Sequence, residues 1–136
     1  MKTQMHTREQ WICCNITDVL TYIAEVRNLP DWNNFFVVVG ALEGDRWLVT
    51  TPQGLARTKL HVERGIGVNE VTISALINGQ ETKAHMKLAS ADGGTQVTFH
   101  LWLPEAMPEP RIDKALLGLE TNLVQLADQL NAHRAG

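Results

Sequence analysis

The sequence predicts a single α+β domain in which an antiparallel sheet curls around a long C-terminal helix. Three observations lead to this fold class. Strand-like segments separated by turn residues fill the chain from Phe35 to Leu103, two tight turns set one consistent register, and leucines recur at helical spacing near the C-terminus. The helical stripe must be buried, and the apolar sheet face is the only surface large enough to receive it. With 136 residues, 44% of them hydrophobic, the chain is long enough to bury one hydrophobic core.

The chain begins with a predicted strand, Arg8–Cys14, and a short helix. Thr17 is the expected N-cap of this helix, because its hydroxyl can accept a hydrogen bond from the first turn. Pro30 disfavours a helical conformation at the residue before it, which predicts a break at Leu29 and a second helical turn around Pro30. The apolar stripe of the first helix consists of Val19, Leu20, Ile23 and Val26.

Three strand candidates follow. The run from Phe35 to Leu42 is apolar almost throughout, which predicts a strand covered on both faces. Trp47–Thr51 predicts the next strand, and turn residues separate it from both neighbours. Leu55–Arg64 alternates between apolar and polar residues, which is typical of a half-buried antiparallel strand.

Two dipeptides predict tight hairpins and thereby the register of the central strands. Asn78-Gly79 and Asp92-Gly93 both suit a two-residue turn that needs positive φ at its two central positions. The first turn pairs Ile73 with Ala84, and the second pairs Ala84 with Leu101. Both turns place apolar residues on the same face, and a slip of one residue would turn all of them over. Ala84 and Leu101 are therefore expected to face the last helix.

The last helix is predicted from about Glu109 to His133. Pro108 and Pro110 lie at its start, where a missing N–H is tolerated. We expect Gly118 to mark close packing, because glycine otherwise weakens a helix. The apolar stripe consists of Ile112, Leu116, Leu119, Leu123, Leu126 and Leu130.

Composition argues against several classes of protein. The net charge of −3 and the absence of a basic run argue against binding to nucleic acid. No stretch approaches the roughly 18 apolar residues of a membrane span, and the polar first ten residues do not resemble a signal peptide. Cys13 and Cys14 are adjacent, which disfavours a disulfide between them and is consistent with thiols in a reducing compartment. We therefore expect a cytoplasmic protein.

One segment resembles a known family. Val19–Asn33, with the letters VLTYIAEVRNLPDWN, is similar to the W-x-Y-I-A-D…N-L-P-x-W segment of small bacterial proteins of the START-like (SRPBCC) superfamily, including polyketide cyclase-like members. Val19 or Leu20 stands where those proteins carry an aromatic residue. The order of elements also resembles their helix-grip fold. The resemblance implies a curved seven-stranded antiparallel sheet wrapped around the C-terminal helix, with two short helices after the first strand.

The superfamily includes carriers, cyclases and regulators, so the resemblance transfers no catalytic residue. One helix cannot fill a strongly bent sheet along its whole length, and we expect an apolar pocket between them. The leading hypothesis is the binding or transport of a small hydrophobic molecule, such as a lipid, an isoprenoid or an aromatic polyketide, without a cofactor. The expected lining is Phe36, Val38, Leu60, Val62, Ile73, Ala75, Ala84, Met86, Phe99, Leu101, Leu116, Leu119 and Leu123.

Two alternatives stay open at this point. A cyclase or dehydratase would be favoured by a buried carboxylate or histidine with a shifted pKa in the pocket. A module that binds a protein partner, including a homodimer, would be favoured by an exposed apolar patch around Trp102.

If Ile66-Gly67 is a further tight turn, the expected register also places four residues in one row across the polar outer face, namely His61, Thr72, His85 and His100. Thr72 interrupts this row and no carboxylate is expected beside it, so we predict no metal site there. Two imidazoles this close should repel when protonated, so at least one should have a pKa below the usual value of about 6.5.

Overall fold

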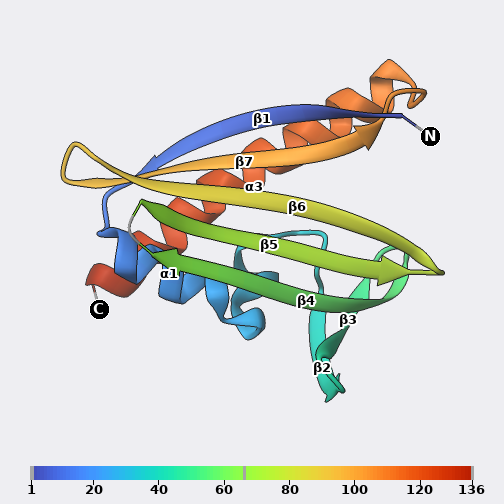
Figure 1. The fold of residues 1–136 in the computed structure, drawn as a ribbon, viewed down its shortest axis with the longest axis horizontal. Helices are drawn as coiled ribbons and strands as arrows, with labels where there is room; N and C mark the ends of the chain where they lie inside the picture. The colour runs from blue at the N-terminus through green and yellow to red at the C-terminus, as the bar shows by residue number, and fades with distance from the viewer. Residues whose placement is uncertain (1, 66, 136) are drawn as a thin grey trace.

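The computed structural model describes residues 2–65 and 67–135, with side chains as far as Asn131. It has the predicted α+β architecture, with one seven-stranded sheet in the order β1-β7-β6-β5-β4-β3-β2 and antiparallel pairing throughout. In Figure 1, β2 and β3 run at a steep angle to the long central strands, which shows how strongly the sheet bends. The strands are β1 (Thr3–Ile12), β2 (Val38–Glu43), β3 (Arg46–Thr51), β4 (Gly54–Gly65), β5 (Val68–Ile77), β6 (Gln80–Ala91) and β7 (Gly94–Pro104).

Helices cover one face of the sheet, which we call the inner face. The long helix α3 (Glu109–Ala135) crosses behind β1 and β7 in Figure 1, and its C-terminal part approaches α1 (Ile16–Ala24). A 3-10 turn, η1 (Val26–Asn28), joins α1 to the short α2 (Leu29–Trp32). The predicted order of elements is thus confirmed from the first strand to the last helix.

The short helices begin at residues other than those expected. Asn15, and not Thr17, is the N-cap of α1, and its Oδ1 accepts a hydrogen bond from the backbone N–H of Asp18 at 2.9 Å. Leu29 is helical, with φ −51° and ψ −48°, although it precedes Pro30. The proline lies in the first turn of α2, where its missing N–H has no intrahelical partner to lose. Leu29 is also fully buried, and this burial offsets the disfavoured conformation.

Both predicted hairpins are confirmed with their registers. Asn78 and Asp92 have φ values of 51° and 49°, and each following glycine has φ 79°, as a turn with two left-handed residues requires. Ala84 pairs with Ile73 on one side and with Leu101 on the other. A further turn predicted at Ile66-Gly67 includes Ile66, which lies outside the described residues.

The strand expected at Phe35–Leu42 differs from the prediction. It begins only at Val38, and β2 is an edge strand, paired with β3 alone and mostly exposed. A run of apolar residues at a sheet edge looks the same in the sequence as a strand covered on both faces. Phe36 is buried, but it lies before the strand.

Two details near the termini were also not as expected. β1 runs from Thr3 to Ile12 and not from Arg8 to Cys14, so both cysteines follow the strand. They are not joined by a disulfide. Gly118 lies against open space, because a Cβ built there would meet no atom within 4 Å. The expectation of close packing at Gly118 is therefore wrong.

The core lies between the inner face, the short helices and the C-terminal part of α3. The predicted leucine stripe is confirmed, although it is unevenly buried. Leu119, Leu123, Leu126 and Leu130 are buried, whereas Ile112 and Leu116, nearer the start of α3, are only partly buried. The core is thus sealed at one end of the helix and less covered at the other.

Candidate ligand-binding site

A row of apolar residues crosses the inner face at the less covered end of the core. Leu60 on β4 pairs with Ile73, Ile73 with Ala84, Ala84 with Leu101, and Leu101 with His6 on β1. Ile73 is buried, but Leu60, Ala84 and Leu101 are only partly buried while they pack against the core. We call these four apolar residues the inner strip.

The next row along the strands is more completely covered. It runs from Val62 through Val71, Met86 and Phe99 to Arg8. Val71, Met86 and Phe99 are buried within the core, and only Val62 of the apolar members is partly exposed. Solvent therefore has better access to the inner strip than to this second row.

The structure divides the thirteen expected lining residues into three groups. Partly buried are Leu60, Val62, Ala84, Leu101 and Leu116. Buried in the packed core are Phe36, Ile73, Ala75, Met86, Phe99, Leu119 and Leu123.

Val38 alone lies apart, 57% exposed on the edge strand. It pairs with Thr50, which is exposed on the outer face, and so it does not line the interior. The expectation for Val38 is therefore wrong, because β2 is an exposed edge strand and is not covered on both faces.

Three polar atoms near the core are buried without a hydrogen-bond partner among the described residues: Nε2 of His6, Oγ1 of Thr58 and Nε1 of Trp32. His6 lies at the β1 end of the inner strip, opposite Leu101. Thr58 precedes Leu60 by two residues on β4 and so points to the same face. Buried polar groups of this kind are rare in folded proteins and need a partner.

Sequence reasoning missed His6, because the first seven residues were not assigned to a strand. The residues before Arg8 show no alternation of apolar and polar side chains in the sequence, and their alternation between partly buried and exposed positions appears only in the structure.

Polar contacts hold α3 against the elements on either side. The Arg8 guanidinium of β1 forms an ion pair with Glu120 at 2.8 Å. Nε2 of Gln125 donates a hydrogen bond to the backbone carbonyl of Asp31 at 2.9 Å, which ties α3 to α2. These contacts fix the helix at the β1 and α2 sides of the inner face, away from β4.

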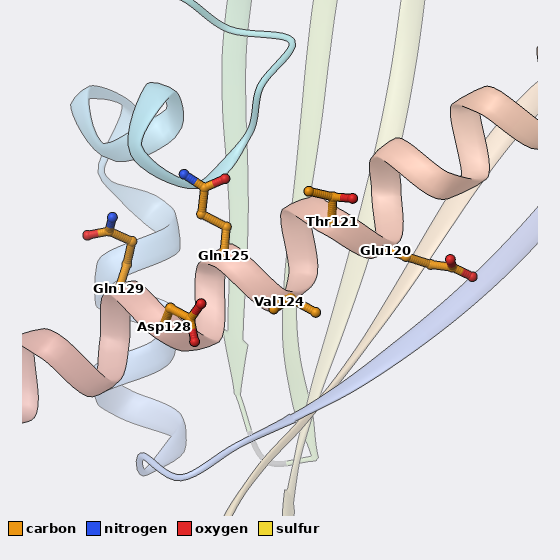
Figure 2. Close-up of a pocket in the computed structure, with 6 residues that line it drawn as sticks. All are labelled: Glu120, Thr121, Val124, Gln125, Asp128 and Gln129. Carbon is orange, nitrogen blue, oxygen red and sulfur yellow. The ribbon is translucent and has the colours of Figure 1, made fainter.

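A surface groove of about 620 Å³ lies on the outward side of α3 (Figure 2). Its residues all come from this helix, and Val124 is its apolar member: Glu120, Thr121, Val124, Gln125, Asp128 and Gln129. A second hollow lies on the outer face of the sheet, and neither hollow lies between the sheet and α3. The inner strip is thus an open apolar surface, and the enclosed pocket expected from the sequence is not one of these hollows.

The outer face carries the expected histidine row, with His85 and His100 as cross-strand partners. Their rings stack with centroids 5.7 Å apart. Burial lowers the pKa of His100 below its usual value, and the neighbouring His85 and Lys87 lower it further. The direction agrees with the prediction, although burial, and not repulsion between the two imidazoles, is its main cause.

The carboxylate judged to be missing from this row is present. Oε1 of Glu70 lies 2.6 Å from Nε2 of His85, because a long side chain on β5 reaches its diagonal neighbour on β6. Among the residues with described side chains, no group of three or more His, Cys, Asp or Glu could hold a metal ion.

The other groups with shifted pKa values lie away from the inner strip. Burial raises the pKa of the Tyr22 phenol on α1, and the charge of Asp31 raises it further. The pKa values of Asp45 and Glu81 are lowered by hydrogen bonds and ion pairs on the outer side of the sheet. Within the described part of the chain, no helix has the length and apolar character needed to cross a membrane.

Comparison with known proteins gives the fold. Neither protein-family models nor curated proteins match the sequence. Among solved structures, a START superfamily protein from Mycobacterium smegmatis superposes with a TM-score of 0.74 at 12% identity, covering 94% of this chain and 97% of that one. Ara h 8.0201 gives a TM-score of 0.65 at 12% identity, with 96% and 99% covered. The protein XoxI from Bacillus cereus gives 0.66 at 16% identity, with 96% of each chain covered. The chain therefore has the START-like helix-grip fold.

Proposed function

We propose that this protein binds a small apolar molecule carrying one hydrogen-bonding group, on the inner strip between the sheet and α3. The observation that carries the proposal is that three of the four apolar side chains in one cross-strand row are only partly buried. Leu60, Ala84 and Leu101 are held in place by the sheet register and yet are incompletely covered by α3. A ligand that covers them gains roughly 25 cal/mol for each Å² of apolar surface removed from water.

His6 and Thr58 suggest what the ligand carries besides apolar surface. A hydroxyl or carboxyl group on the ligand could hydrogen-bond to Nε2 of His6 at one side of the strip, or to Oγ1 of Thr58 at the other. Fatty acids, isoprenoid alcohols, sterols and aromatic polyketides all combine such a group with a large apolar body. Binding sites for such molecules are mostly apolar with a few placed polar groups.

A thermal-shift screen against these four classes tests the proposal. A compound that binds only the folded state raises stability by about 2.7 kcal/mol at a hundredfold excess over its Kd. Ala84→Leu should abolish the shift, because it fills the middle of the strip while keeping it apolar. His6→Phe should weaken the response to compounds with a hydroxyl or carboxyl group and spare hydrocarbons of similar size.

Ala89→Leu is the matched control on the same strand. Ala89 is exposed and lies on the outer face, so the same added volume should leave the ligand response unchanged. A stabilising compound whose effect survives Ala84→Leu at full size binds elsewhere and contradicts the proposal.

A second candidate function rests on the outer face of β1 and β7. Met5 and Trp102 are cross-strand partners and are 51% and 37% exposed. Such an apolar pair is the patch that would favour a protein partner, including a second copy of this chain. Light scattering gives the molar mass of the purified protein and of a Met5→Ser, Trp102→Ser double variant. A dimeric wild type and a monomeric double variant support this candidate. If both proteins are monomers, the homodimer is ruled out.

A further inference from the structure

A hollow of about 290 Å³ on the outer face of the sheet gathers cationic side chains around a floor of hydroxyl groups. Lys59 on β4 pairs with Ser74 on β5, and Ser74 pairs with Lys83 on β6. Adjacent strands lie about 4.8 Å apart, so the two lysine backbones are about 10 Å apart, with only a small serine between them. Thr72, two residues along β5, is similarly short. Long side chains on the outer strands and short ones on the middle strand therefore create the hollow.

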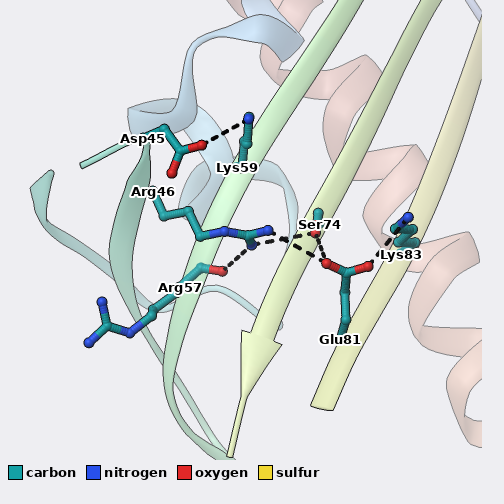
Figure 3. Close-up of polar contacts among 7 residues, drawn as sticks. All are labelled: Asp45, Arg46, Arg57, Lys59, Ser74, Glu81 and Lys83. Carbon is teal, nitrogen blue, oxygen red and sulfur yellow. Dashed lines mark hydrogen bonds and ion pairs between the residues drawn. The ribbon is translucent and has the colours of Figure 1, made fainter. Parts of the chain in front are cut away.

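Arg46 extends over this floor from β3. Its guanidinium donates to the backbone carbonyl of Arg57 at 3.1 Å and lies 3.5 Å from Oγ of Ser74. The arginine thus reaches across β4 to the middle strand, as Figure 3 shows.

Glu81 shows which chemistry the hollow accepts. Its carboxylate accepts a hydrogen bond from the Ser74 hydroxyl at 3.1 Å and forms ion pairs with Arg46 at 3.5 Å and Lys83 at 3.3 Å. Figure 3 shows these donors converging on the carboxylate from three strands. The hydrogen bonds from Ser74 and Lys83 lower the pKa of Glu81, so the group stays ionised. One residue of the chain therefore occupies the position of a bound oxyanion.

The charges around the hollow are not balanced by this carboxylate. Arg46, Lys59 and Lys83 are cationic, and Glu81 is the only carboxylate among the residues that line it. Two carboxylates outside the lining also lie near it: Asp45 forms an ion pair with Lys59 at 3.0 Å from an exposed turn, and Glu63 lies 3.3 Å from His61, which lines the hollow. Within the lining itself, three cationic side chains face one carboxylate, in a chain whose net charge is −3.

We propose that this hollow binds the phosphate group of an anionic ligand, which contacts Arg46, Lys59, Lys83 and the Ser74 hydroxyl and displaces the carboxylate of Glu81. A phosphate carries more charge than a carboxylate and offers more acceptor oxygens, so it can engage Lys59 and Lys83 at once. The phosphate of a soluble metabolite and that of a lipid headgroup share this chemistry.

Calorimetric titration of the full chain with pyrophosphate at low salt tests the site. Glu81→Gln should tighten binding about fivefold, because it removes the competing charge, and Lys83→Gln should weaken it by a similar factor. Added salt should weaken binding to both the wild type and Glu81→Gln, since the hollow is open to solvent. A second arm uses flotation with phosphatidylcholine vesicles, with and without phosphatidic acid.

Substitutions of exposed residues outside the hollow serve as controls, because they change the net charge by the same amount as the site variants. Glu105→Gln, after β7, and Lys114→Gln, on α3, should leave both readouts unchanged. If Glu81→Gln tightens and Lys83→Gln weakens binding of pyrophosphate, the ligand carries a soluble phosphate. If these two changes are seen only with phosphatidic acid vesicles, the ligand is a lipid headgroup. The proposal is overturned if neither probe binds wild type or Glu81→Gln, or if the control variants shift binding as much as the site variants.

Discussion

Gly94 and Gly118 lie in opposite surroundings, although neither has a positive φ. A Cβ built at Gly94 would lie 2.4 Å from the backbone oxygen of Ile12 and 2.7 Å from the ring of Trp11. A Cβ at Gly118 would meet no atom within 4 Å. The close approach that the sequence predicted at Gly118 is therefore found at Gly94, where β7 begins beside the end of β1.

Alanine substitutions at these glycines should change stability in opposite directions. Gly118→Ala should raise the free energy of unfolding by about 0.5–1 kcal/mol, because alanine restricts the unfolded chain and favours the helix. Gly94→Ala should lower it by more than about 1 kcal/mol, because backbone atoms must shift. Urea unfolding of both variants measures the two changes. Equal effects at the two sites would show that the strand contact at Gly94 has been misjudged.

His100 should make stability depend on pH in the weakly acidic range. Its pKa is lower in the folded protein than in the unfolded chain, first because it is partly buried and then because His85 and Lys87 lie nearby. The unfolded state then binds the proton more readily, so stability falls as the pH drops through about 6.5. His100→Gln should lose less stability than the wild type between about pH 7.5 and about pH 5.

Chemical unfolding across this range, together with an NMR titration of the His100 ring, measures the effect. Thr7 lies within hydrogen-bond distance of Nδ1 of His100, and glutamine can keep such a contact. A His100 ring that titrates above about 6.5 would contradict the assigned direction.

Residue-level features that depend on diagonal or edge neighbours were not predictable from the sequence. Glu70 reaches His85 diagonally, whereas the register gives only direct partners. His6 became relevant only once β1 was seen to pair with β7 along its whole length. Local patterns carry no information about a partner some ninety residues away in the chain.

At the scale of elements, α3 shows how one helix serves the core on one side and solvent on the other. Leu123 is 1% exposed, whereas Leu117 on the same helix is 63% exposed. Leu123→Ala should therefore cost about 2–5 kcal/mol of stability, as is usual for a large side chain in a packed core. Leu117→Ala is the matched control and should change stability by less than about 0.5 kcal/mol.

Denaturant titration of the two variants separates packing from helix propensity, because both carry the same substitution in one helix. A loss below about 1 kcal/mol for Leu123→Ala would mean that the site has an unfilled cavity beside it.

The elements whose signals are local were those predicted correctly. Asn78 and Asp92, each followed by glycine, predict a tight turn, and the two turns together set the register of β5, β6 and β7. β2 was misjudged, because burial of an apolar strand depends on what lies beside it in space. The open inner strip was beyond prediction for the same reason, since its exposure depends on where Arg8 and Asp31 hold α3.

At the scale of the whole molecule, the two edges of the sheet differ in support. β1 is backed by α3, to which the Arg8–Glu120 ion pair connects it. β2 at the opposite edge pairs only with β3, has a register shift between Val39 and Leu42, and is largely exposed. In Figure 1, the β2–β3 hairpin extends away from the helices. The fold should therefore open first at β2.

Hydrogen exchange followed by mass spectrometry should order the strands accordingly. Peptides from β2 should exchange fastest, because few buried contacts resist local opening there. Peptides from β6, which is paired on both sides and carries the buried Met86 and Leu88, should exchange only in global unfolding. β1 is the control, since it is also an edge strand, and it should exchange more slowly than β2 because α3 supports it. If β2 proves as protected as β6, another chain must cover that edge in solution, and its exposed apolar residues would then belong to an interface.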